Sequence, residues 1–167
     1  MNYHNITKDD MLNGDGLRVV LWVSGCNMNC IGCQNPETHS PNSGILFDNK
    51  AEDELFTSLE PDYIEGITLS GGHPLDPHNL SEVKRLVLKF KDKFPNKTIW
   101  LYTGYTWEQI QEMPDCKEIV DLVDVLVDGK YMINLHDTKL KWRGSSNQRV
   151  IDVQKSLQNG KIVLYCD

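Results

Sequence analysis

The sequence predicts an α/β fold built on a parallel sheet, and two observations lead to that prediction. Apolar runs of strand length recur along the chain, at residues 17–23, 64–69, 98–102 and 123–127. Loops and helical patterns separate them, and strands that alternate with helices are typical of a parallel sheet. The chain has 167 residues, whereas a complete eight-unit barrel needs at least about 200. Any barrel is therefore partial.

The first strand candidate, Leu17–Val23, is apolar almost throughout. Such a run suits a strand covered on both faces, as in a parallel sheet. The turn signal Asn13–Gly16 (NGDG) launches it. Met1–Asp10 shows no clear pattern and is expected to be an irregular lead-in.

Helical patterns lie between the strand candidates. We expect helices over residues 51–59, 77–93 and 106–113, a loop over residues 34–48, and a last strand-like piece over residues 161–165. Asn79 with Glu82, and Thr106 with Gln109, have the spacing of a capping box. The whole chain, residues 1–167, is expected to form one domain.

Composition excludes several classes of function. The net charge is −7, which argues against nucleic acid or an anionic membrane as the main partner. There is no apolar signal-peptide core near the N-terminus and no apolar run of membrane-spanning length,. We therefore expect a cytoplasmic protein with reduced or metal-bound cysteines.

Three cysteines, Cys26, Cys30 and Cys33, follow the first strand with the spacing C-x3-C-x2-C. Clustered thiolates usually hold a metal. Structural zinc favours four ligands in paired units, and no second pair follows. Iron–sulfur clusters are also held by closely spaced cysteines, and three ligands would leave one iron open for chemistry. A zinc knuckle and buried thiols remain as alternatives.

Three further segments narrow the interpretation: Asn13–Arg18 (NGDGLR), Gly32–Pro36 (GCQNP) and Trp142–Arg149 (WRGSSNQR). With the cysteine spacing, they resemble the radical S-adenosylmethionine (SAM) enzymes that activate glycyl-radical proteins. The last segment resembles the branch that acts on anaerobic ribonucleoside-triphosphate reductase. The resemblance covers about residues 1–152.

The resemblance implies a partial radical SAM β/α barrel of about five or six strands, open on one side for a protein substrate. It implies a [4Fe–4S] cluster on Cys26, Cys30 and Cys33, with SAM on the fourth iron. The implied partners are the catalytic subunit of the reductase and a flavodoxin- or ferredoxin-type electron donor. The same chemistry on another target, such as pyruvate formate-lyase, is an alternative.

The resemblance also implies the contacts to SAM. The implied set is Gly32, Cys33, Gln34, Gly71, Gly72, Asp128 and Lys130. From the residues alone, the two glycines are a plain turn or a place where a ligand approaches the backbone. Asp128 and Lys130 are ligand contacts at a strand end or a surface ion pair.

His73 stands where the family usually has Glu or Asp after the two glycines. A carboxylate pairs with the amino group of SAM, whereas a neutral imidazole only accepts a hydrogen bond from it and a protonated one repels it. We therefore expect His73→Asp to leave SAM affinity equal or better. None of the histidines is expected to be catalytic.

The polar segment Trp142–Arg149 has two interpretations. Arg143 is suited to grip a carboxylate, and Asn147 and Gln148 to bond a peptide backbone. A self-capping loop is the alternative. Cys116 and Cys166 lack cluster spacing and are expected to be ordinary thiols.

Overall fold

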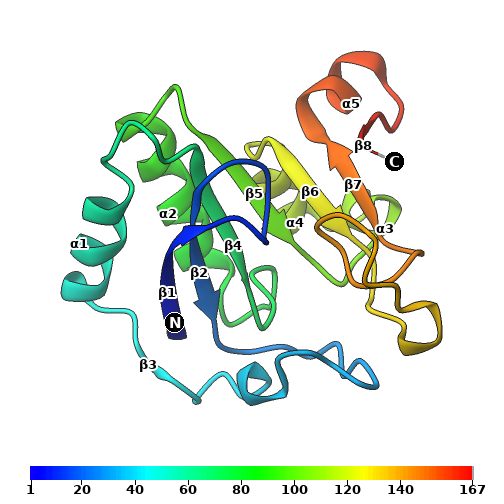
Figure 1. Cartoon of the computed structure of the whole chain (residues 1–167), viewed down its shortest axis with the longest axis horizontal. Helices are drawn as coiled ribbons and strands as arrows, with labels where there is room; N and C mark the ends of the chain where they lie inside the picture. Colours follow the sequence, from blue (N-terminus) through cyan, green and yellow to red (C-terminus); the bar gives the residue numbers. More distant parts are fainter. Residues whose placement is uncertain (167) are drawn as a thin grey trace.

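The computed structural model describes residues 1–166 and contains one eight-stranded sheet, in the order β3-β1-β2-β4-β5-β6-β7-β8 (Figure 1). The strands are β1 (Asn2–Asp10), β2 (Arg18–Val23), β3 (Ile45–Leu46), β4 (Gly66–Gly71), β5 (Thr98–Tyr102), β6 (Val125–Asp128), β7 (Arg149–Asp152) and β8 (Leu164–Cys166). Four neighbours, β2, β4, β5 and β6, are parallel. The remaining pairs are antiparallel.

Five α-helices accompany the sheet: α1 (Asn49–Ser58), α2 (Leu80–Lys93), α3 (Trp107–Gln111), α4 (Pro114–Val120) and α5 (Val153–Asn159). Two short 3-10 turns, η1 (Pro36–Thr38) and η2 (Ile133–Leu135), lie in the long loops after β2 and β6. None of the helices in residues 1–166 is long and apolar enough to cross a membrane.

The expected partial barrel with parallel strands is confirmed, but two details were wrong. The lead-in at residues 1–10 is strand β1, which pairs antiparallel with β2. Its few apolar side chains, including Tyr3 and Ile6, are buried, so tertiary pairing and not local pattern makes it a strand. The sheet also exceeds five or six strands, because β1, β3, β7 and β8 extend its edges.

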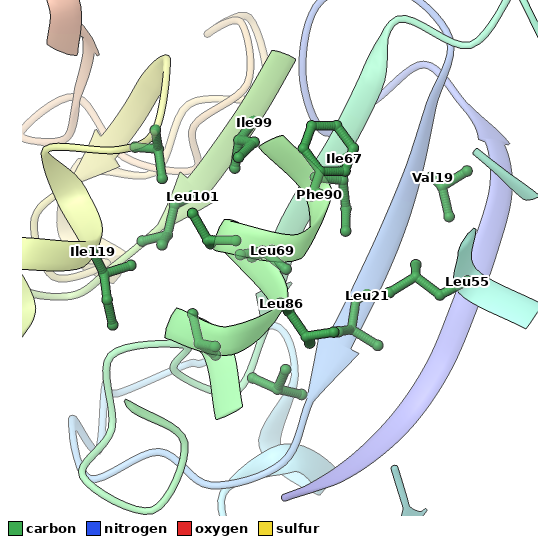
Figure 2. Close-up of a cluster of buried hydrophobic side chains, with 14 of the residues drawn as sticks. Val19, Leu21, Leu55, Ile67, Leu69, Leu86, Phe90, Ile99, Leu101 and Ile119 are labelled. Atoms are coloured by element: carbon green, nitrogen blue, oxygen red, sulfur yellow. The ribbon is translucent and has the colours of Figure 1, made fainter. Parts of the chain in front are cut away.

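The main core lies between the sheet and helices α1, α2 and α4 (Figure 2). Alternate residues of the central strands point into it, such as Leu69 of β4 and Leu101 of β5, and meet Leu86 and Phe90 of α2. This alternation follows from the two-residue period of a strand. The other residues of β5, Trp100 and Tyr102, point to the opposite face, where a smaller apolar cluster forms.

Arg18 fills the space beneath that opposite face and is 1% exposed. Its guanidinium donates to Thr68 Oγ1 at 2.9 Å and to the carbonyl oxygens of Ile67 and Thr98, each at 2.9 Å. It also lies over the ring of Trp100, 5.5 Å from the centroid. Burial lowers the pKa of Arg18 to about 10. The buried guanidinium therefore has hydrogen-bond acceptors on both neighbouring strands, β4 and β5.

The two expected capping boxes had different outcomes. Thr106 and Gln109 form one at the start of α3. Asn79 begins α2 without a side-chain cap, and the helix starts three residues later than the expected residue 77. The Asn79 side chain instead donates to the carbonyl oxygens of Ser24 at 2.8 Å and His73 at 3.0 Å. It ties together the two loops that build the candidate site.

Candidate functional site

The carboxyl ends of the four parallel strands meet at one edge of the sheet, and their loops surround a cavity of about 220 Å³. The loop after β2 carries the three cysteines and runs along the lower edge of Figure 1, in blue to cyan. The turns after β4 and β5 contribute the pairs Gly72–His73 and Thr103–Gly104. Sites in α/β folds gather at this end of the strands.

Cys26, Cys30 and Cys33 all line this cavity. They are free and half-buried. Burial, followed by the proximity of the other two cysteines, raises the pKa of the Cys26 thiol. Within residues 1–166, no three side chains of the Cys, His, Asp or Glu type are grouped closely enough to hold an ion. The fold nevertheless brings the three thiols to one cavity. Because each thiol lies near two others, a bound cation would favour ionisation to the thiolate.

The two glycines of the β4 turn also line the cavity, and the backbone around them explains why they are glycine. Gly71 has φ +105°, and a Cβ there would lie 2.6 Å from the backbone nitrogen of Val23. At Gly72, a Cβ would lie 2.6 Å from the carbonyl oxygen of Gly25. A close approach between the glycine turn and the cysteine loop therefore requires both glycines.

Backbone hydrogen bonds fix that approach. The N–H of Gly72 donates to Val23 at 2.8 Å, and the N–H of His73 donates to Gly25 at 2.7 Å. On the other side of the loop, the N–H of Gly25 donates to Thr38 at 2.7 Å. The segment just before Cys26 is therefore held from both sides like a short strand.

His73 is 1% exposed and lines the cavity. Its Nε2 lies 2.7 Å from Thr103 Oγ1, and its ring packs against Tyr105 with 4.7 Å between centroids. Burial lowers the pKa of His73 to about 4. The imidazole is therefore neutral at pH 7, so it neither forms an ion pair with a carboxylate nor repels an ammonium.

Two imidazole nitrogens of this cavity, His73 Nδ1 and His39 Nε2, are buried and have no hydrogen-bond partner among residues 1–166. Buried polar atoms are almost always paired, and each exception asks for a reason. Unpaired polar atoms that line a cavity fit a site completed by a ligand. Sequence reasoning missed His39, which has no motif of its own.

Asp128 does not line the cysteine cavity. Its carboxylate is 1% exposed and accepts from Arg149 Nη2 at 2.6 Å, Arg149 Nε at 3.1 Å and the N–H of Trp107 at 2.8 Å. Arg149 also reaches Glu108, at 2.8 Å. These charge-assisted hydrogen bonds raise the pKa of Arg149, and the bonds that Asp128 accepts contribute more than those that Glu108 accepts,.

The segment Trp142–Arg149 caps itself, so the second interpretation of this segment holds within the chain. Gln148 Oε1 accepts from the N–H groups of Gly144 and Ser145, at 3.0 and 3.1 Å. The amide nitrogens of Gln148 and Asn147 donate to the carbonyl oxygens of Gly129 at 3.0 Å and Lys130 at 2.8 Å. These side chains do bond a peptide backbone, but it is the chain's own.

Comparison with known proteins decides the family. Residues 12–151 match the family described as "4Fe-4S single cluster domain". The anaerobic ribonucleoside-triphosphate reductase-activating protein of Enterobacteria phage T4 is 47% identical over 150 residues, 90% of this chain and 93% of that protein. The proteins of the same name from Escherichia coli (strain K12) and Vibrio cholerae are 43% and 44% identical, over 90% and 89% of this chain and 97% and 96% of theirs.

The chain belongs to this family of activating proteins. It is an iron–sulfur activating enzyme of the radical SAM type, as the motifs indicated. The residues of the cavity fit the two cofactors of that type, because soft thiolates suit iron and sulfide. The unpaired imidazole nitrogens, which line the cavity together with the glycine turn, suit a polar small molecule.

The structure divides the expected SAM contacts of this activating protein into two groups. Cys33, Gln34, Gly71 and Gly72 line the cavity. Gly32, Asp128 and Lys130 lie outside it: Gly32 packs beside Ile133, Asp128 is engaged by Arg149, and Lys130 is exposed. Gly129, between Asp128 and Lys130, does line the cavity. Cys116 is buried in the main core and does not line the cavity.

Proposed function

We propose that this chain activates the catalytic subunit of anaerobic ribonucleoside-triphosphate reductase by creating a radical on one of its glycines. When bound, the cluster and SAM together supply one-electron cleavage chemistry that removes a hydrogen atom from a glycine Cα. The electron comes from a flavodoxin- or ferredoxin-type donor, and the cleaved SAM leaves as methionine and 5′-deoxyadenosine. The carrying observation is that the three cysteines and the double-glycine turn line one cavity.

In this proposal Cys26, Cys30 and Cys33 are the cluster ligands. Their loop is anchored on both sides of Gly25, and the N–H of Cys33 donates to the carbonyl oxygen of Cys30 at 3.2 Å, which closes a turn between these two cysteines. The N–H of Asn35 points to Cys33 Sγ at 3.4 Å. An N–H donor to sulfur stabilises a thiolate and tunes a cluster bound there.

SAM is proposed to lie over the glycine turn. Gly71 and Gly72 offer backbone without side chains, and Cys33 and Gln34 line the same cavity. Gly32, Asp128 and Lys130 complete the proposed set from the rim. Asp128 acts there through structure, because its bonds to Trp107 and Arg149 set the turn that presents Gly129.

The proposed partners are proteins, and neither nucleic acid nor a membrane is among them. The net charge of −7 disfavours polyanions,. A cytoplasmic location belongs to the same proposal. An incomplete barrel leaves one side of the sheet without strands, which suits entry of a loop from a protein substrate.

The proposal is tested by comparing two cysteine variants, Cys30→Ala and Cys116→Ala, in anaerobically reconstituted protein. Both remove one thiol, but only Cys30 lines the cavity. We expect Cys30→Ala to lose the cluster absorbance and reductase-dependent 5′-deoxyadenosine formation, while Cys116→Ala keeps both. Retained SAM cleavage in Cys30→Ala would overturn the ligand assignment. Stoichiometric zinc with no iron in the unmodified protein would overturn the function.

A further inference from the structure

His73 Nδ1 is a polar atom whose hydrogen-bonding role can be deduced. The ring is neutral at pH 7, so one nitrogen carries a hydrogen and the other a lone pair. Nε2 has one partner, Thr103 Oγ1 at 2.7 Å, and Nδ1 has none. The direction of the bond to Thr103 therefore decides what Nδ1 offers.

Thr103 settles that direction. Its Oγ1 already accepts from the N–H of Tyr105 at 3.1 Å. The hydroxyl hydrogen needs an acceptor, and within residues 1–166 its one hydrogen-bonding neighbour besides that N–H is His73 Nε2. If Thr103 donates to Nε2, every polar atom of the Thr103 side chain is satisfied and the imidazole hydrogen is on Nδ1. The reverse arrangement would leave a buried hydroxyl hydrogen unpaired, which is unfavourable.

The charge of the cavity lining determines how much a hydrogen-bond donor on His73 matters for a bound ligand. No Lys, Arg, Asp or Glu is among the residues from 1 to 166 that line it. The carboxylate of bound SAM would therefore meet only neutral donors on this lining, and a buried polar or charged group needs hydrogen-bond partners,. A carboxylate at position 73 would instead present a negative charge to the carboxylate of SAM, beside the three cysteines.

We infer that His73 presents Nδ1–H as a hydrogen-bond donor to the carboxylate of SAM, which reverses the polarity expected for this position. The contact is a positioning one. It rests on the proposed binding of SAM to this cavity. It also reverses the expectation that His73→Asp is harmless.

A pair of isosteric variants tests this inference. Asn carries an amide nitrogen at the same distance from the backbone as Nδ1, and Asp carries an acceptor there. SAM affinity is measured by anaerobic calorimetry on the reconstituted holoenzyme at pH 8. We expect His73→Asn to bind within about threefold of the unmodified protein and His73→Asp to bind at least tenfold more weakly, about 1.4 kcal/mol. Asp binding as well as or better than Asn would overturn the inference.

The tautomer of His73 can be read directly by nuclear magnetic resonance. In ¹⁵N-histidine-labelled apoprotein, the nitrogen shifts of His73 should report hydrogen on Nδ1. They should report mixed tautomers in Thr103→Val and the original one in Thr103→Ser. Hydrogen on Nε2 in the unmodified protein would contradict the inference.

The midpoint potential of the cluster shows whether His73 contacts SAM or the cluster itself. Without SAM, this potential should be the same in the unmodified protein and in His73→Asn, because both side chains at position 73 are neutral. A potential shift with unchanged SAM affinity would place the contact on the cluster and overturn the assignment to SAM. If the unmodified holoenzyme bound no SAM at all, the proposed function itself would fail, and this inference would fall with it.

Discussion

The cavity has two walls that differ in how their polar groups are satisfied. On the cysteine wall, the three cysteines are free, and His39 Nε2 and His73 Nδ1 have no hydrogen-bond partner within residues 1–166. On the wall beyond β6, Gln148 lines the cavity and donates to Gly129, and Asp128, which lies outside the cavity, accepts from Arg149. Unsatisfied groups are available to a ligand, and satisfied groups hold the backbone. Mutations on the first wall should therefore lower binding, and mutations on the second should lower stability.

The largest effect on stability is expected for Arg149→Ala. This change leaves Asp128, which is 1% exposed, without its main partner. Breaking a buried ion pair from one side costs about 3–5 kcal/mol. Urea unfolding of the apoprotein measures the loss. Lys84→Ala is the matched control, because its pair with Glu118 is exposed and worth about 0–1 kcal/mol. Equal losses in the two variants would break the comparison.

A pH series on the apoprotein tests the burial of His73. Its pKa is lowered to about 4 in the folded state, against about 6.5 in the unfolded chain. Above pH 6.5 both states are neutral, and as the pH falls towards 4 only the unfolded chain takes up the proton. Stability therefore falls across this window, by up to about 3 kcal/mol. His73→Asn should remove that part of the slope, and an unchanged slope would show that His73 is not buried as described.

Gly72→Ala tests the contact between the glycine turn and the cysteine loop. The new Cβ would meet the carbonyl oxygen of Gly25 at 2.6 Å. Overpacking of this kind costs about 1–3 kcal/mol, and displacement of the cysteine loop should also reduce iron content after reconstitution. Gly160→Ala is the control, since its φ of +67° is strained but nothing lies within 4 Å. Loss of iron in the control as well would point to general instability.

The smallest effect on stability is expected for Cys33→Ala in the apoprotein. Cys33 is half-buried and accepts one long contact, from the N–H of Asn35 at 3.4 Å. The free energy of unfolding should change by less than about 1 kcal/mol, while iron binding is lost. A large destabilisation would mean that the cysteine wall is structural, and the distinction between the walls would fail.

The sequence could predict the elements whose signal is local, and it missed those that depend on long-range pairing. Strands β2, β4, β5 and β6 were predicted because both of their faces are covered, so their residues form continuous apolar runs,. Strand β1 was missed because its pattern is polar and its pairing with β2 is long-range. Helix α4 was missed because Pro114 and Asp115, which start it, also signal a turn,.

The site residues also divide into those with a local sequence signal and those whose partners are distant in sequence. The cysteines could be predicted from spacing, because three ligands in one loop are local in sequence. The roles of Asp128 and Arg149 could not, because 21 residues separate the two partners of that ion pair. His73 could be located by its place after the glycines, but its hydrogen-bond polarity depends on Thr103 and Tyr105, on the neighbouring strand turn.

The most direct test of the central claim is the electron paramagnetic resonance spectrum of a mixture of reduced reconstituted protein, SAM and the reductase catalytic subunit. The account predicts a glycine-centred doublet that requires all three components and that broadens when the reductase carries ¹³C-labelled glycine. Deoxyadenosine formation without that doublet, or a signal unaffected by the label, would contradict it.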